Sequence, residues 1–161
     1  MTETLSFRAA FARLPAGVSV LTTAGEAGCC GMTATAVCSV TDDPPTVLVC
    51  VNRNSAMNEV FKTNGRVVLN VLSGEHEEVA RHFAGMTGIA MDDRFARDGW
   101  QSEEGAVPVL PDALVNIAGH IDQVVEVGTH SVLLIAVEEI RAGSGAAALV
   151  YFGRDFHKIG A

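Results

Sequence analysis

The chain has few basic residues and no long apolar run. Lysine and arginine together number 11 against 19 acidic residues, and the formal net charge is -8 over 161 residues. Because the basic residues are scattered, we expect no positive surface of the kind that holds a nucleic-acid backbone. No stretch approaches the roughly 18 consecutive apolar residues that cross a bilayer. The sequence therefore predicts neither a nucleic acid nor a membrane as a partner.

The cysteines and histidines lack the spacing of a metal or redox site. The four cysteines are Cys29, Cys30, Cys38 and Cys50, and no pair has the C-x-x-C spacing. We interpret all four as small buried hydrophobic residues of strands, with a redox role for Cys38 as a minority alternative. His76 and His82 cannot share a helical face at i, i+4, so we predict no metal.

Length and composition are typical of a single domain, residues 1–161, with a core of its own. The beginning, Met1-Thr-Glu-Thr-Leu5, carries an acid and no basic segment, which indicates a mature cytoplasmic start. Hydrophobic residues make up 48% of the chain, a high share for a small acidic protein. A buried interface between identical subunits is the predicted use of that surplus.

Most of the expected elements are strands. Alternation and β-branched residues predict strands over 18–23, 30–40, 46–51, 66–72, 113–127, 131–140 and 149–152. Helices are expected over 5–14, over 55–63 with Ser55 as N-cap, and over 73–83 with Ser73 as N-cap. Residues 86–111 are expected to form a long irregular excursion. This pattern favours a mainly β fold, a closed or half-closed antiparallel barrel with a few flanking helices.

One strand contains only small residues where a strand normally carries bulk. From Thr33 to Ala36 nothing is larger than threonine, so the backbone is open to a flat partner. Asn52, Asn54 and Ser55 supply polar groups at the next strand end, before a helix N-terminus that favours an anion. The sequence shows no nucleophile and no acid-base pair. A planar, phosphate-bearing cofactor that carries its own chemistry fits best, with hydride transfer as the leading reaction.

Six segments together are similar to the short-chain flavin reductases that partner two-component flavin monooxygenases. They are Gly31 to Val40, Asn54-Ser-Ala-Met-Asn58, Leu69-Asn-Val-Leu-Ser73, Ala80-Arg-His-Phe-Ala-Gly85, Gly128-Thr-His130 and Val150 to His157. The second and fourth most resemble the branch that serves 4-hydroxyphenylacetate 3-monooxygenases. The resemblance implies a split Greek-key β-barrel homodimer that reduces FAD or FMN with NADH and releases reduced flavin to a separate oxygenase.

The resemblance also implies roles for individual residues. The isoalloxazine would lie along Thr33, Ala34, Thr35 and Ala36, and the ribityl and phosphate groups would be held by Ser39, Val40, Asn52, Asn54 and Ser55. Arg81, His82 and Phe83 would cover the outer flavin or the adenine. The nicotinamide side would consist of His130, Tyr151, Arg154, Phe156 and His157. His130 would position the nicotinamide or polarise the flavin edge without forming a covalent bond.

Each of these residues also fits a structural role. On pattern alone Phe83 suits the core, Asn52 to Ser55 suits a turn and helix cap, and His130 suits a hydrogen-bonded structural histidine. Two other functions stay open. One is the flavin reductase of pyrimidine utilisation, and the other is a flavin- or heme-binding protein on the same barrel without turnover. The C-terminal half has few basic residues to meet a 2′-phosphate, which favours NADH over NADPH.

Overall fold

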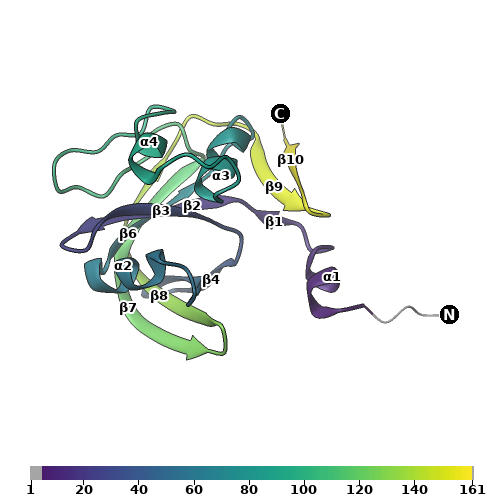
Figure 1. The fold of residues 1–161 in the computed structure, drawn as a ribbon, viewed down its shortest axis with the longest axis horizontal. Helices are drawn as coiled ribbons and strands as arrows, with labels where there is room; N and C mark the ends of the chain where they lie inside the picture. The colour runs from purple at the N-terminus through teal and green to yellow at the C-terminus, as the bar shows by residue number, and fades with distance from the viewer. Residues whose placement is uncertain (1–4, 161) are drawn as a thin grey trace.

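The computed structural model describes residues 5–160, so the sequence start at Met1 to Thr4 lies outside the described residues (Figure 1). In chain order the elements are α1 Phe7–Phe11, β1 Ala16–Gly17, β2 Ser19–Gly25, β3 Gly28–Ala34, β4 Val37–Asp42, β5 Pro45–Asn52, α2 Met57–Asn64, β6 Arg66–Val71, α3 Glu77–Phe83, α4 Met91–Phe95, β7 Val115–Val127, β8 His130–Ala142, β9 Ala148–Phe152 and β10 Asp155–Ile159. The chain is therefore mainly β, as predicted.

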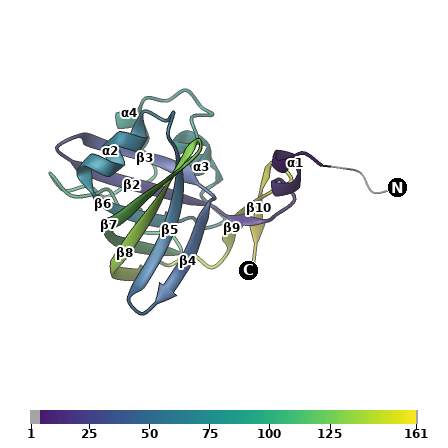
Figure 2. The same cartoon turned by 90° about the horizontal axis from the view of Figure 1, so that it is seen from below.

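The larger sheet has seven strands in the order β3-β2-β6-β7-β8-β5-β4, and every neighbouring pair is antiparallel. Its two edge strands, β3 and β4, follow each other in the chain, so the sheet curls round and stays open between them (Figure 2). A smaller sheet, β1-β9-β10, lies beside it. This is the predicted split antiparallel barrel.

The β7–β8 hairpin is the longest feature of the sheet, with 13 residues in each strand. β7 pairs with β6 and β8 pairs with β5, so the hairpin joins the two halves of the barrel. The register shifts between Ala118 and Gly119, where a bulge bends the strand. A Cβ on Gly119 would overlap the carbonyl oxygen of Ala136, so this bend requires glycine.

Two clusters of buried side chains form the core. The barrel interior is filled by strand residues such as Leu21, Val49 and Leu133, with Phe61 of α2 entering from one end. The second cluster lies where α3, the segment before β7, and β9 pack together, and it includes Phe83 and Leu110. Because both clusters are apolar, β2 and β6 are buried on both of their faces.

The structure corrects several expected element boundaries. The predicted strand 30–40 is two strands, β3 and β4, and β10 was not expected at all. α1 spans five residues and buries none of them. Ser73 does not cap α3; instead its backbone N–H and its hydroxyl both approach His76 Nδ1, at 3.2 and 3.0 Å. α4 interrupts the excursion that was expected to be irregular.

The cysteines were predicted to be buried, and only Cys30 is. Cys29 and Cys38 are exposed, Cys50 is half-buried, and all four are free thiols. Burial, with a smaller contribution from Cys29, raises the pKa of Cys30 to about 11. Burial and then Asp92 raise the pKa of Cys29 as well. Cys30 is therefore a neutral thiol at physiological pH and a poor nucleophile.

A fully buried asparagine ties the sheet to the segment that precedes β7. Asn70 Nδ2 donates to the Val20 carbonyl at 3.0 Å and to Thr22 Oγ1 at 3.2 Å. Its Oδ1 accepts from the Leu110 N–H at 3.0 Å and from Asn116 Nδ2 at 2.9 Å. Asn70 is 0% exposed, so in the folded chain these bonds are made without solvent competition.

We therefore expect Asn70→Ala to lower the free energy of unfolding by about 2–4 kcal/mol, because it leaves buried donors without acceptors. Urea denaturation followed by far-UV circular dichroism measures the change. Gln123→Ala, which removes an exposed amide from β7, is the matched control. A loss for Asn70→Ala no larger than that of the control would show that the segment is held by other contacts.

Candidate active site

The chain between β3 and β4 opens the sheet at Thr35 and Ala36. Both residues are exposed and lie outside any strand, and the Ala36 carbonyl accepts from the Cys50 N–H at 3.0 Å. Thr33 and Ala34 are placed differently from the prediction. Thr33 Oγ1 donates to the Ala80 carbonyl at 2.7 Å, and Ala34 is 5% exposed in the barrel core. The accessible small-residue backbone is thus the pair Thr35–Ala36.

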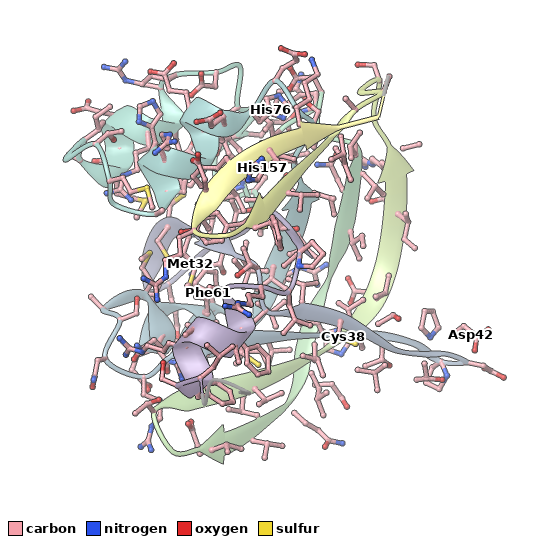
Figure 3. All side chains as sticks on the ribbon, turned by 90° about the vertical axis from the view of Figure 1, so that its right-hand side faces the viewer. Met32, Cys38, Asp42, Phe61, His76 and His157 are labelled. Atoms are coloured by element: carbon pink, nitrogen blue, oxygen red, sulfur yellow. The ribbon has the colours of Figure 1, made fainter. Side chains whose placement is uncertain are left out.

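β4 continues from this opening as an exposed strand. Ser39 is exposed and Val40 is 50% exposed. Figure 3 shows Cys38 and Asp42 on a hairpin that extends away from the body of the molecule. The predicted flavin residues of β4 therefore lie on an open surface, next to the break in the sheet.

The next predicted group follows β5, where the chain turns into α2. Asn52 Oδ1 accepts from the Asn54 N–H at 2.9 Å, which folds the turn onto its own side chain. Ser55 Oγ accepts from the Met57 N–H at 3.3 Å, which satisfies a backbone donor at the start of α2. The predicted cap by Ser55 is wrong: Ala56 is the N-cap of α2 and makes no side-chain cap hydrogen bond, so the Ser55 hydroxyl closes a turn just before the helix. The turn lies at the positive end of the α2 dipole.

His130 lies directly beside this turn. It opens β8 and is the register partner of Asn52 on β5. The Arg53 N–H donates to the Thr129 carbonyl at 2.9 Å, and Arg53 Nη1 donates to the Gly128 carbonyl at 3.2 Å. His130 Nδ1 lies 2.9 Å from Thr129 Oγ1. Hydrogen bonds thus join the Asn52–Ser55 turn, predicted to hold the flavin phosphate, to the segment 128–130, predicted to lie on the nicotinamide side.

A charged cavity of about 430 Å³ borders the same turn. It is lined by Arg53, Asn54, Glu59, Lys62, Glu126, Gly128 and Thr129. Within it, Lys62 Nζ binds Glu59 and Glu126, and Arg53 Nε lies 3.3 Å from Glu126. The hydrogen bond from Lys62, then that from Ser131, lowers the pKa of Glu126. Its carboxylate is therefore charged at neutral pH and connects β7 to α2.

The α3 residues only partly match their predicted role as a cover. Phe83 is 2% exposed, and its ring centre lies 5.0 Å from that of Phe95 and 5.1 Å from that of Trp100. Its ring belongs to the core, not to a ligand surface. His82 is 3% exposed, with Nδ1 2.8 Å from Thr87 Oγ1. Arg81 is the accessible member of the three.

Arg81 meets the C-terminal strands. Its guanidinium lies 5.0 Å from the centre of the Phe156 ring and 3.7 Å from Asp155 Oδ1. Phe156 in turn lies 5.0 Å from Tyr151, ring centre to ring centre. Arg154 holds a left-handed conformation in the β9–β10 turn, with φ at 67°. The structure thus groups Arg81 with Tyr151 and Phe156.

The predicted nicotinamide side is divided within one chain. His130 belongs to the seven-stranded sheet, whereas Tyr151, Phe156 and His157 belong to the three-stranded sheet. His157 Nε2 approaches the Phe152 carbonyl at 3.0 Å, so it closes its own hairpin. No hydrogen bond within residues 5–160 joins His130 to this hairpin.

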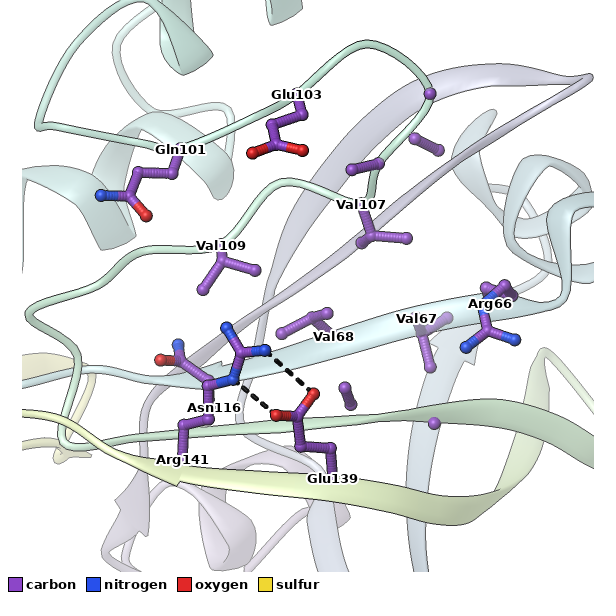
Figure 4. A pocket seen from close by; sticks show the side chains of 15 residues that line it. Arg66, Val67, Val68, Gln101, Glu103, Val107, Val109, Asn116, Glu139 and Arg141 are labelled. Atoms are coloured by element: carbon purple, nitrogen blue, oxygen red, sulfur yellow. Dashed lines mark hydrogen bonds and ion pairs between the residues drawn. The ribbon is translucent and has the colours of Figure 1, made fainter.

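A cavity of about 500 Å³ was missed by the sequence prediction (Figure 4). It lies between strands β6 to β8 and the segment from Gln101 to Val109. Arg141 and Glu139, two residues apart on β8, form a two-point ion pair on its wall, at 2.7 and 3.1 Å. None of the predicted site residues lines it. No local sequence motif could have predicted this cavity, because its lining residues are far apart in the sequence and come together only when the chain folds.

His76 has an internal role. Nε2 lies 3.3 Å from Asp112 Oδ2, and Nδ1 faces Ser73. These contacts connect the segment before α3 to the segment before β7. Because Ser73 is only 4% exposed, the Ser–His–Asp arrangement offers no accessible nucleophile. Residues 5–160 contain no cluster of three or more metal-ligating side chains. Across the same range, no helix is both long and apolar enough to cross a membrane.

Residues 11–160 match the family model described as flavin reductase like domain. The chain belongs to this family. It is 58% identical to the 4-hydroxyphenylacetate 3-monooxygenase reductase component of Pseudomonas aeruginosa, over 96% of this chain and 91% of that protein. It is 44% identical to the FMN reductase (NADH) RutF of Cronobacter turicensis, over 99% and 95% of the two chains. The Streptomyces globisporus C-1027 NADH:FAD oxidoreductase SgcE6 has a similar structure, with a TM-score of 0.87, 27% identity and coverage of 100% and 99%.

The thiol of Cys38 offers a direct test of where flavin binds. Cys38 is exposed and precedes Ser39 and Val40, whereas Cys30 is buried with a raised pKa. We expect Ellman's reagent at pH 8 to label Cys38 fastest, and saturating FAD or FMN to slow that labelling about tenfold or more by covering β4. Cys38→Ser identifies the signal. Equal rates with and without flavin would place the flavin away from β4.

Proposed function

We propose that this protein is an NADH-dependent flavin reductase that acts in the cytoplasm and supplies reduced FAD or FMN to a separate oxygenase. The oxygenase we infer is a 4-hydroxyphenylacetate 3-monooxygenase. The observation that carries this proposal is the 58% identity, along nearly the whole chain, to a reductase component of that name. The four free thiols are in keeping with a reducing compartment.

The geometry suits a reaction in which bound molecules carry the chemistry. Hydride would pass from nicotinamide C4 to flavin N5, which requires stacking of two flat rings. The chain contributes an open backbone at Thr35–Ala36 and a polar turn from Asn52 to Ser55. His130, the register partner of Asn52, would orient the nicotinamide. Proximity and orientation then supply most of the acceleration.

The second candidate is the FMN reductase of pyrimidine utilisation. It is favoured by the 44% identity to RutF over 99% of this chain. Both candidates predict the same fold and the same reaction, and they differ in the pathway that receives the reduced flavin. The higher identity to the 4-hydroxyphenylacetate component supports the first candidate.

A steady-state matrix of NADH and NADPH against FAD and FMN tests the activity. We expect turnover with NADH to exceed that with NADPH by about tenfold or more in kcat/KM, because a 2′-phosphate needs a nearby cation. Of the cations on α3, β10 and the β9–β10 turn, Arg81 is already bound by Glu77 and Lys158 by Glu75, which leaves Arg154. Loss of nicotinamide absorbance is the readout. A protein that binds flavin but oxidises neither nicotinamide would be a carrier.

We also propose that the protein is a homodimer, because one copy leaves apolar surface uncovered at two places. Around α1, Phe7 is 75% exposed, Phe11 57% and Leu14 54%, and the two phenylalanine rings stack on each other. On the β7–β8 hairpin, Val125 is 46% exposed and Val127 59%. Arg8 lies on α1 and Arg13 just after it, while the hairpin carries acidic residues, so the two surfaces are complementary in charge.

In a symmetric pair, α1 of each copy would cover the hairpin of the other. We expect the double variant Phe7→Ala/Phe11→Ala to weaken dimerisation at least about tenfold, because each buried phenylalanine contributes about 1.5–3 kcal/mol. Sedimentation equilibrium measures the effect, and Met86→Ala, which truncates another exposed apolar side chain, is the control. A wild-type protein that is monomeric and fully active at micromolar concentration would contradict the dimer.

A further inference from the structure

Asn58 is a buried polar centre at the junction of β5, α2 and β8. It is 2% exposed, and its Nδ2 lies within hydrogen-bond distance of three acceptors. They are Ser131 Oγ at 3.0 Å, the Val51 carbonyl at 3.3 Å and the Asn52 carbonyl at 3.4 Å. Ser131 Oγ passes the connection on, donating to Glu126 Oε2 at 2.7 Å.

The position of these acceptors is informative. Asn52 begins the turn predicted to hold the flavin phosphate, and Ser131 follows His130 in the chain. One amide group thus bridges the two segments that were predicted to hold the two ligands. Glu126 extends the bridge to Lys62 and Arg53, which lie on α2 and on the turn itself.

The amide is present although it is not fully satisfied. Among the described residues, Asn58 Oδ1 is a buried side-chain oxygen without a hydrogen-bond partner. An orphaned buried acceptor destabilises a fold, and an apolar side chain of similar size would avoid it. The donating half of the amide is therefore the part that the junction uses.

We propose that Asn58 is a positioning residue that fixes the Asn52–Ser55 turn against His130 and thereby sets how flavin and nicotinamide face each other. This inference rests on the proposed function. Asn58 touches neither ligand in this scheme and acts through Asn52 and Ser131. Small displacements of either segment would reduce ring overlap, to which hydride transfer is sensitive.

The competing explanation is that Asn58 only stabilises the fold, and Asn70 provides the comparison. Both are buried asparagines that bridge strands, but Asn70 connects β2 and β6 to the segment before β7. A structural role predicts that Asn58→Ala and Asn70→Ala behave alike. A positioning role predicts that they lower the melting temperature similarly and differ in ligand binding.

Flavin binding is measured by the quenching of FAD and FMN fluorescence, and NADH turnover is measured in parallel. We expect Asn58→Ala to raise the flavin dissociation constant and to lower kcat, each about tenfold, while Asn70→Ala changes each less than about twofold. Ser131→Ala, which removes one hydroxyl, should shift both quantities in the same direction by a smaller factor. Ser131→Thr keeps the hydroxyl, so its flavin dissociation constant and kcat should stay near those of the wild type.

The outcomes distinguish a failure of the proposed function from a failure of the role proposed for Asn58. Wild-type protein that neither binds flavin nor oxidises NADH would overturn the proposed function and this inference together. Wild-type activity with unchanged binding and kcat in Asn58→Ala and Ser131→Ala would overturn only the role of Asn58. Equal losses in Asn58→Ala and Asn70→Ala would do the same. If Asn58→Ala does not fold, the Ser131 pair decides.

Discussion

The antiparallel pairing of the β7–β8 hairpin is the constraint on which the rest of the structure depends. β6 is placed by β7 and β5 by β8, so both strands that lead into the site take their positions from one hairpin. The bend at Gly119 allows those two halves to curve toward each other. A Cβ at this position would overlap the Ala136 carbonyl oxygen, and the bend could not form.

The barrel produces the site by leaving one edge unpaired. β3 and β4 are consecutive edge strands, and the two residues between them, Thr35 and Ala36, are exposed and lie outside any strand, with the Ala36 carbonyl bonded to the Cys50 N–H. The turn after β5 supplies a second open backbone, at the start of a helix. Exposed backbone groups and helix starts are the parts of a protein that bind a flat ring and an anion with few charged side chains. An acidic chain can thus form such a site.

The sequence predicted the features that depend on local pattern. Alternation predicted most strands, and the helix expected after Ser55 is present, although Ala56 and not Ser55 is its N-cap. It did not predict the break after Ala34, since that break follows from the closure of the sheet. The ligand role of Phe83 came from the resemblance, whereas the local pattern suited the core in which Phe95 and Trp100 pack against it. β10 was missed because its polar sequence becomes a strand only through pairing with β9.

The division of the predicted nicotinamide side is the strongest reason to consider more than one copy of the chain. His130 stands at the tip of the barrel hairpin, and the Tyr151–Phe156 pair lies in the smaller sheet beside α3. If both contribute to one site, a single chain would need to deform one of two well-paired sheets. A symmetric dimer requires no deformation. Its two-fold axis would place the β7–β8 hairpin of each copy against the smaller sheet of the other. The apolar α1 and the apolar hairpin tip lie on these same two parts of the molecule, so the contact that covers them would also bring the separated groups together.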